Sequence, residues 1–120
     1  MTGFISELAS AADSESPREE RARAAAEMIR TTQNYRWVGI YDIDDDDVAL
    51  IGGAGERPAS EAARTRSTVV AGAEIVVPIL GAESGIAIGT LDAQSDRAGA
   101  RSDDIPFLEE CAAALRPLYD

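Results

Sequence analysis

The sequence of 120 residues contains no histidine and a single cysteine, Cys111. Because imidazole nitrogen and thiolate sulfur are the usual protein ligands of zinc, copper and iron, this shortage argues against a transition-metal site. A lone cysteine also excludes a disulfide within the chain, which is typical of proteins that stay in the cytoplasm. We therefore expect a cytoplasmic protein with neither a metal nor a cofactor.

Lysine is missing as well: the 11 basic residues are all arginine, they face 22 acidic residues, and the net charge is −11. Such a charge repels phosphate backbones and anionic lipid surfaces, so we expect neither nucleic acid nor a membrane as a partner. No apolar run approaches the roughly 18 residues of a membrane helix, and the start of the chain lacks the pattern of a secretion signal. The length predicts one domain over residues 1–120.

Two patterns near the N-terminus predict helices. Apolar residues recur at helical spacing within residues 1–12. A second helix should begin with Ser16 as its N-cap, since Pro17 and Glu19 complete a capping-box pattern, and should run to about Thr32. Its alanine-rich side predicts close packing in the core or, alternatively, against a second copy in a homodimer.

Residues 35–43 are aromatic and β-branched, which predicts a strand. Alternate side chains of a strand share a face, so Trp37, Gly39 and Tyr41 should point to the same side. Two aromatic rings that bracket a glycine are typical of ordinary core packing, and they would equally form a concave site with aromatic walls.

The next segment begins with four aspartates at residues 44–47. We interpret them as a solvated turn before a strand at 48–51, rather than as a calcium loop, because the glycine and the spaced ligands of such a loop are missing. Residues 52–55 (GGAG) are expected to form a mobile loop, and they lack the Gly-Lys-Ser/Thr of a phosphate-binding loop. Residues 56–66 are predicted to be loop, in which residues 59–63 are also compatible with a helical turn, followed by a short strand at 68–71.

Two short β-branched runs, 73–80 and 85–92, are separated by a turn and predict a β-hairpin. Both runs are apolar at nearly every position, so both faces of this hairpin should be covered. The exceptions are Glu74 at the start of the first strand and Asp92 at the end of the second. Two carboxylates at the rim of a buried sheet need a functional explanation.

A last helix is predicted after Ser102-Asp103-Asp104, with Pro106 in its first turn. Cys111 falls on the apolar stripe of this helix, which predicts a small buried hydrophobic side chain. The order of the elements predicts an α+β fold, with a central antiparallel sheet of five to six strands flanked by N-terminal and C-terminal helices.

Three motifs then suggest a family. The segments 35–41 (YRWVGIY), 74–79 (EIVVPI) and 89–95 (GTLDAQS) resemble motifs that follow in the same order in GAF domains. Among GAF domains, they are most similar to the free methionine-R-sulfoxide reductases. The resemblance extends over residues 35–51 and 73–109, and its specificity comes from the three motifs together.

This resemblance implies a binding pocket. It would be formed by Trp37 and Tyr41 of the first motif, Glu74 of the second, and Asp92 of the third; Gln94 stands where the family has a second acidic residue. Carboxylates hold an ammonium group, and aromatic rings enclose an apolar or thioether chain. The implied ligand is a small amine-bearing or zwitterionic molecule.

The resemblance also implies what is missing. The catalytic cysteines of the reductases lie between the second and third strands, but the corresponding residues 52–72 contain none. Sulfoxide reduction needs one thiolate to attack sulfur and a second thiol to resolve the intermediate. We therefore predict a non-catalytic GAF protein that binds a small molecule or regulates a separate signalling partner. The alternatives are a dimerising interaction domain with a closed pocket and a reductase that borrows a thiol from another protein.

Overall fold

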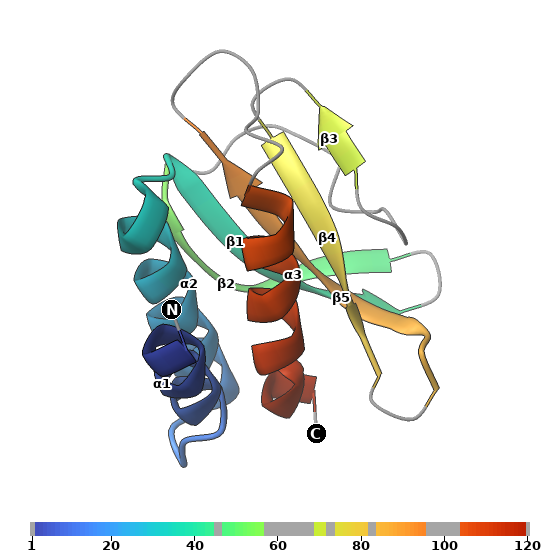
Figure 1. Cartoon of the computed structure of the whole chain (residues 1–120). Coiled ribbons are helices and arrows are strands. Elements are labelled where there is room, and N and C mark those ends of the chain that lie inside the picture. Colours follow the sequence, from blue (N-terminus) through green and yellow to red (C-terminus); the bar gives the residue numbers. More distant parts are fainter. Residues whose placement is uncertain are drawn as a thin grey trace.

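The structure is a computed structural model that describes residues 2–44, 47–56, 69–71, 74–81, 84–95 and 104–119. Figure 1 shows its helices and strands in chain order. The helices are α1 (Thr2–Ala12), α2 (Arg18–Gln33) and α3 (Ile105–Ala114), followed by a 3-10 turn, η3 (Arg116–Tyr119). The strands are β1 (Trp37–Asp44), β2 (Asp47–Gly55), β3 (Val69–Ala71), β4 (Glu74–Leu80) and β5 (Ala87–Gln94). No helix within the described ranges is both long and apolar enough to cross a membrane.

The described strands form one antiparallel sheet in the order β2-β1-β5-β4-β3. Two helices, α2 and α3, pack against one face of this sheet, and α1 packs on these helices from the same side (Figure 1). The predicted fold class is therefore confirmed: the protein is α+β, with helices from both ends of the chain on an antiparallel sheet. The predicted hairpin at 73–92 is also confirmed as the antiparallel pair of β4 and β5.

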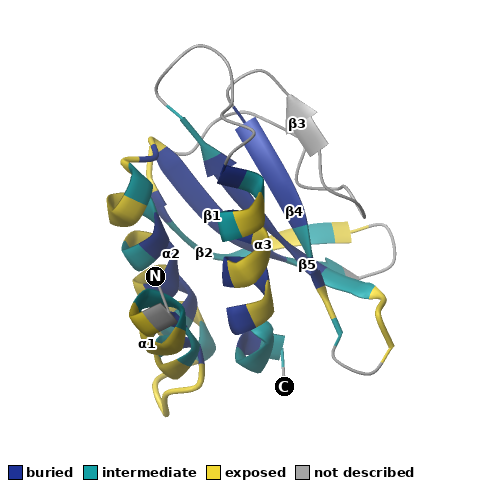
Figure 2. Cartoon of the chain, viewed as in Figure 1, coloured by how far each residue is buried: buried dark blue, intermediate teal, exposed yellow. Residues whose placement is uncertain are grey.

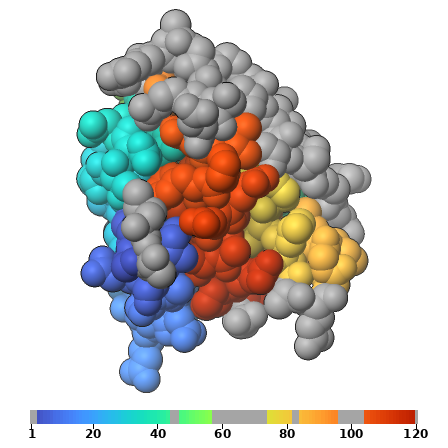
Figure 3. Space-filling view, in the orientation of Figure 1, coloured from blue at the N-terminus to red at the C-terminus, as the bar shows by residue number. Residues whose placement is uncertain are grey.

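The main hydrophobic core lies between the helices and the sheet. Val38 and Ile40 of β1, and Leu91 of β5, are fully buried in it against the helices. Cys111 of α3 belongs to the same core and has no exposed surface, as its position on the apolar stripe predicted. Figure 3 shows this helical side, where α3 lies between the N-terminal helices and the β4–β5 hairpin.

Two predictions about local structure are wrong. Residues 52–55 do not form a loop but continue β2, where they pair with the first half of β1. The small residues let this part of β2 lie close to α2. A β-carbon at Gly52 would lie only 2.9 Å from the β-carbon of Ala22 in α2. Ser16 is not the N-cap of α2: Pro17 takes that position without a side-chain cap, and the Ser16 carbonyl instead accepts a hydrogen bond from Arg21 Nε at 2.9 Å.

Several other boundaries agree with the sequence. Asn34 ends α2 in the left-handed conformation with φ of 56°, and Pro106 lies in the first turn of α3. A short strand occurs at Val69–Ala71, as predicted. Of the predicted turn at 44–47, residues 44 and 47 belong to β1 and β2, and residues 45–46 lie outside the described residues. Residues 57–66 of the loop predicted at 56–66 lie outside them as well.

An arginine joins the two ends of the chain to the sheet. Arg18 at the start of α2 makes two hydrogen bonds to the Asp42 carboxylate, at 2.8 and 2.6 Å, and a third to the Leu118 carbonyl at 2.7 Å. Its guanidinium group also lies 5.2 Å from the centre of the Tyr119 ring. Tyr119 in turn donates a hydrogen bond to the Tyr41 carbonyl at 2.7 Å. These contacts fix η3 against β1.

The Tyr119 contact depends on a glycine in the neighbouring strand, and this can be tested. A β-carbon at Gly89 would overlap the Tyr119 hydroxyl and the Tyr41 carbonyl oxygen. We expect Gly89→Ala to lower the free energy of unfolding by about 1–3 kcal/mol through overpacking, as measured by urea denaturation. Gly3→Ala is the matched control, since Gly3 lies in α1 with nothing within 4 Å of an added β-carbon. Equal effects of the two substitutions would contradict this packing.

Candidate functional site

The face of the sheet that points away from the helices is also buried. Trp37 and Tyr41 of β1 are 4% and 6% exposed, although neither belongs to the helix-side core. Figure 2 shows that β4 and the middle of β5 are buried along most of their length. The prediction that both faces of the hairpin are covered is therefore confirmed. This second face contains the residues that the resemblance singled out.

Strand register brings the predicted residues together. Trp37 lies opposite Gln94 in the β1–β5 pair, and Gln94 lies opposite Glu74 in the β4–β5 pair. Asp92 pairs with Gly39 on one side and with Val76 on the other. Side chains two residues apart in a strand share a face, so Glu74 and Asp92 are diagonal neighbours. The sequence-predicted residues thus occupy one patch of this face, spread over β1, β5 and β4.

The aromatic side chains close over Gly39. A β-carbon on this glycine would lie 2.8 Å from atoms of both the Trp37 ring and the Tyr41 ring. The indole of Trp37 also covers Gly53 of β2, where any side chain would overlap the ring. Gly39 and Gly53 therefore form the floor on which the Trp37 indole lies.

Two members of this surface were not predicted. Gly53 was assigned to a loop, because glycine-rich sequence is depleted in strands. Thr90 is fully buried and lies opposite Tyr41 and Pro78, on the same face as Asp92. Thr90 could have been predicted from its position two residues before Asp92, because alternate side chains of a strand share a face.

Glu74 and Asp92 form a buried pair of acids. They are 5% and 1% exposed, and they lie diagonally opposite each other on the neighbouring strands β4 and β5. Glu74 is the first residue of β4, as predicted, whereas Asp92 lies two residues before the end of β5. Burial first, and then the hydrogen bond and the charge of Glu74, raise the pKa of the Asp92 carboxyl to about 9.

The buried polar atoms of this patch include a donor and an acceptor. Trp37 Nε1, a donor, and Asp92 Oδ1, an acceptor, have no hydrogen-bond partner among the residues that the structure describes. Buried polar groups are nearly always paired, and leaving one unpaired costs about 1–3 kcal/mol. The patch therefore contains a buried donor and a buried acceptor whose hydrogen bonds the described residues do not provide.

The cysteine lies on the other side of the sheet. Cys111 packs between α3 and the strands, whereas Asp92 and Trp37 belong to the opposite face. Burial, and to a smaller extent the charge of Glu110, raise the pKa of the Cys111 thiol to about 12. A thiol in this environment stays protonated and unreactive near neutral pH. Within the described part of the chain, no cluster of three or more metal-ligating side chains occurs either.

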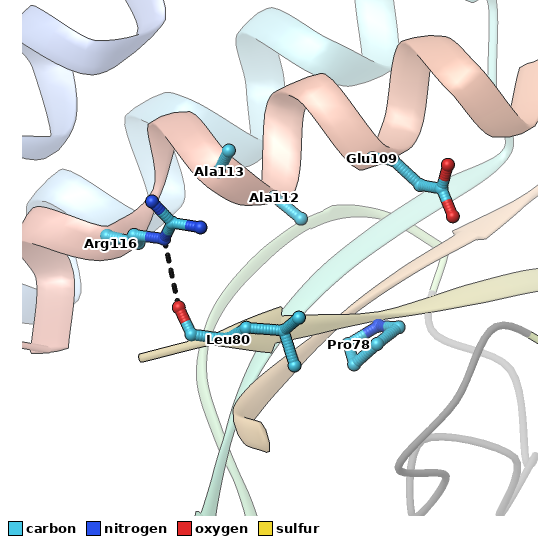
Figure 4. Close-up of a pocket in the computed structure, with 6 residues that line it drawn as sticks. All are labelled: Pro78, Leu80, Glu109, Ala112, Ala113 and Arg116. Atoms are coloured by element: carbon cyan, nitrogen blue, oxygen red, sulfur yellow. Dashed lines mark hydrogen bonds between the residues drawn. The ribbon is translucent and has the colours of Figure 1, made fainter. Parts of the chain in front are cut away.

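Two cavities in the described residues lie away from this patch. One of about 160 Å³ lies between α3 and the end of β4, where Arg116 donates to the Leu80 carbonyl at 2.9 Å (Figure 4). The other, of about 350 Å³, is open and lies beside the Arg18–Asp42 pair. Its two arginines already bind Asp42 and backbone carbonyl groups. Neither cavity contains a residue that the resemblance predicted.

Comparison with known proteins identifies the fold. The sequence matches no protein-family model, and no curated protein is similar enough to count as a match. Solved structures do match. The free methionine-R-sulfoxide reductase of Neisseria meningitidis, in complex with its substrate, has a TM-score of 0.77 and 23% identity over 97% of this chain and 86% of that one.

Structures of other GAF domains match as well. A protein assigned as a GAF sensor from Burkholderia vietnamiensis has a TM-score of 0.78 and 21% identity over 99% of this chain and 96% of that one. The GAF domain of an Acinetobacter phosphoenolpyruvate-protein phosphotransferase has a TM-score of 0.72 and 11% identity, over 98% and 90% of the two chains. The protein therefore has the GAF fold, which reductases and sensor-type domains share.

The acid pair predicts an unusual pH dependence of stability. Asp92 has an ordinary pKa of about 3.9 when unfolded, but folding raises its pKa. The folded state therefore binds more protons between these two values, and its stability falls as the pH rises. Asp92→Asn keeps a hydrogen-bonding group that cannot ionise, so it should remove this fall.

Thermal unfolding between pH 5 and pH 9 checks this prediction. At pH 8 we expect Asp92→Asn to have a melting temperature at least about 4 °C above that of the wild type, with a smaller difference at low pH. Glu7→Gln, which removes an exposed carboxylate from α1, is the control and should leave the profile unchanged. A wild-type profile that is flat over this range would contradict the buried, protonated pair.

Proposed function

We propose that this protein is a GAF module that binds a small molecule with a protonated amine, and that it is not a catalyst on its own. The observation that carries this proposal is the acid pair of Glu74 and Asp92, buried on an aromatic sheet face. The cost of burying a carboxylate is offset when a cation pairs with it. The commonest cationic group in small metabolites is an ammonium group. The pair is therefore suited to receive an amine.

The surroundings favour a zwitterion over a simple amine. Asp92 Oδ1 is a buried acceptor for an ammonium N–H, whereas Trp37 Nε1 offers an N–H to an oxygen of the same ligand. The rings of Trp37 and Tyr41 provide an apolar wall and interact favourably with a nearby cation. A free amino acid or a close derivative has this combination of ammonium, oxygen acceptor and short apolar chain.

The lack of catalysis is proposed from the thiol chemistry. The single cysteine of the chain is buried on the helix side of the sheet, so it has no path to a ligand beside Asp92. Ligand binding without turnover is the property of a sensor or regulatory module. Such a module would act through a separate signalling partner, as the sequence predicted.

Ligand binding can be tested with free amino acids and methionine sulfoxide. We expect at least one of these compounds to raise the melting temperature of the wild type and to bind in calorimetry. Glu74→Gln and Asp92→Asn should each weaken that binding more than about tenfold, or 1.4 kcal/mol, because each removes one of the two negative charges. Glu7→Gln is the matched control and should bind as the wild type does.

The expected loss of binding is separable from a loss of folding. Asp92→Asn should be more stable than the wild type at pH 8 and yet bind more weakly, a combination that no folding defect produces. The same compound without its amino group should fail to bind. If no compound of the set binds at millimolar concentration, the proposal fails, and the interaction-domain alternative takes its place.

The proposed lack of catalysis has its own test. With methionine sulfoxide and an excess of a dithiol reductant, we expect the purified protein to produce no methionine above the rate of the reductant alone. Cys111→Ser should give the same result. Turnover by the wild type that is lost in Cys111→Ser would contradict the assignment of Cys111 as a core side chain.

A further inference from the structure

We propose that the ligand of this site carries a hydroxyl group beside its amine, and that Trp37 Nε1 and Asp92 Oδ1 recognise this hydroxyl together. The inference rests on the proposed function, since it names the class of amine that the same site prefers. It adds a requirement that holding an ammonium group does not impose: the ligand needs one group that both accepts and donates a hydrogen bond.

The Trp37 indole lies across two strands, with its N–H at the end nearer to β5. A β-carbon at Gly53 of β2 would meet Cη2, Cζ2 and Cζ3 of this ring, whereas one at Gly39 of β1 would lie 2.9 Å from Nε1. Gly39 and Gly53 pair with each other, and β1 lies between β2 and β5. The ring therefore runs from β2 towards β5, and Nε1 lies over Gly39.

Asp92 lies beside this N–H group. It pairs with Gly39 between β1 and β5, and residues directly opposite each other project to the same face with β-carbons about 4.5–5.5 Å apart. Trp37 Nε1 takes up the space in which a side chain at position 39 would begin, so it is the neighbour of the Asp92 carboxyl group. A donor and an acceptor thus lie next to each other on one sheet face.

These two atoms are buried and are not bonded to each other. Trp37 and Asp92 are 4% and 1% exposed. Among the residues that the structure describes, neither Nε1 nor Oδ1 has a hydrogen-bond partner. Buried polar groups are nearly always paired, because leaving one unpaired costs free energy. A ligand group that bonds to both atoms therefore gains from both.

The chemistry of the two atoms selects a hydroxyl. Nε1 needs an acceptor and Oδ1 needs a donor, and a hydroxyl oxygen supplies both from one atom. An ammonium group only donates, so it leaves Nε1 unpaired, whereas a sulfoxide or a carboxylate only accepts. A ligand carboxylate at this place would also lie beside Asp92, which carries a like charge when it holds the ammonium group.

The hydroxyl and the amine can bind the same carboxylate. An ionised carboxylate has about four lone-pair sites on its two oxygens, so Asp92 can accept from the ammonium group and from the hydroxyl together. Both groups must then lie close to each other on the carbon chain of the ligand. The implied ligand is an amino alcohol or a hydroxy amino acid.

Matched pairs of amines test this preference, because the members of each pair differ only at the hydroxyl. Serine is compared with alanine, threonine with valine, and ethanolamine with ethylamine, by calorimetry on the whole protein at pH 7. We expect the hydroxyl member of at least one pair to bind at least about tenfold more tightly. In Trp37→Phe, which keeps an aromatic ring without the N–H, the affinity ratio of that pair should fall close to one. Glu7→Gln is the control and should keep the wild-type ratio.

The single tryptophan of the chain provides a second measurement that needs no variant. In a nitrogen-15 spectrum, the one indole N–H signal belongs to Trp37. We expect the preferred hydroxyl compound to move this proton signal downfield, as a new hydrogen bond does, and to slow its exchange with water. The partner compound without the hydroxyl should bind without either change.

The outcomes separate this inference from the proposed function. Amines that bind without a preference for the hydroxyl overturn the inference and leave the proposed function standing. A hydroxyl preference that survives in Trp37→Phe overturns the role of Nε1. Tighter binding of asparagine than of serine and threonine overturns the hydroxyl, since an amide also accepts and donates. If none of these compounds binds at millimolar concentration, the inference and the proposed function fail together.

Discussion

The burial of both faces of β5 is the constraint on which the rest of the structure depends. This strand lies at the centre of the described sheet, between β1 and β4. Its alternate side chains serve different purposes: Leu91 and Ala93 fill the core under the helices, while Thr90 and Asp92 face the other side. A shift of the strand by one residue would exchange the two sets and place a carboxylate in the hydrocarbon core. The register is therefore fixed by the same alternation that creates the site.

The two sides of the sheet divide stability and function between them. On the helix side, apolar packing and the bidentate Arg18–Asp42 contact join the chain ends to the sheet. On the other side, the buried side chains include two acids and two aromatic rings. Burying the acids adds little stability by itself. The cysteine lies on the stabilising side, which separates thiol chemistry from the site.

Much of the fold was readable in the sequence, because it depends on local patterns. The hairpin of β4 and β5, the shared face of Trp37 and Tyr41, and the burial of Cys111 all follow from periodicity. The extension of β2 through Gly52 and Gly53 does not, since glycine disfavours strands. The close approach of α2 explains Gly52, and the Trp37 ring explains Gly53.

Contacts between residues far apart in the sequence could not be predicted either. The Arg18 contact with Leu118 joins residues 100 positions apart. That Glu74 and Asp92 become buried neighbours likewise follows from strand register, which no local pattern reveals. The position of each acid could be predicted from the motifs, but its burial could not.

A crystal structure of the protein with the amino acid that binds it most tightly would test the central claim most directly. The account predicts that the ammonium nitrogen lies within about 3.2 Å of an oxygen of both Asp92 and Glu74, with the ligand chain against the Trp37 ring and an oxygen of the ligand accepting from Trp37 Nε1. A ligand bound elsewhere, or one whose ammonium group points away from the acid pair, would contradict it.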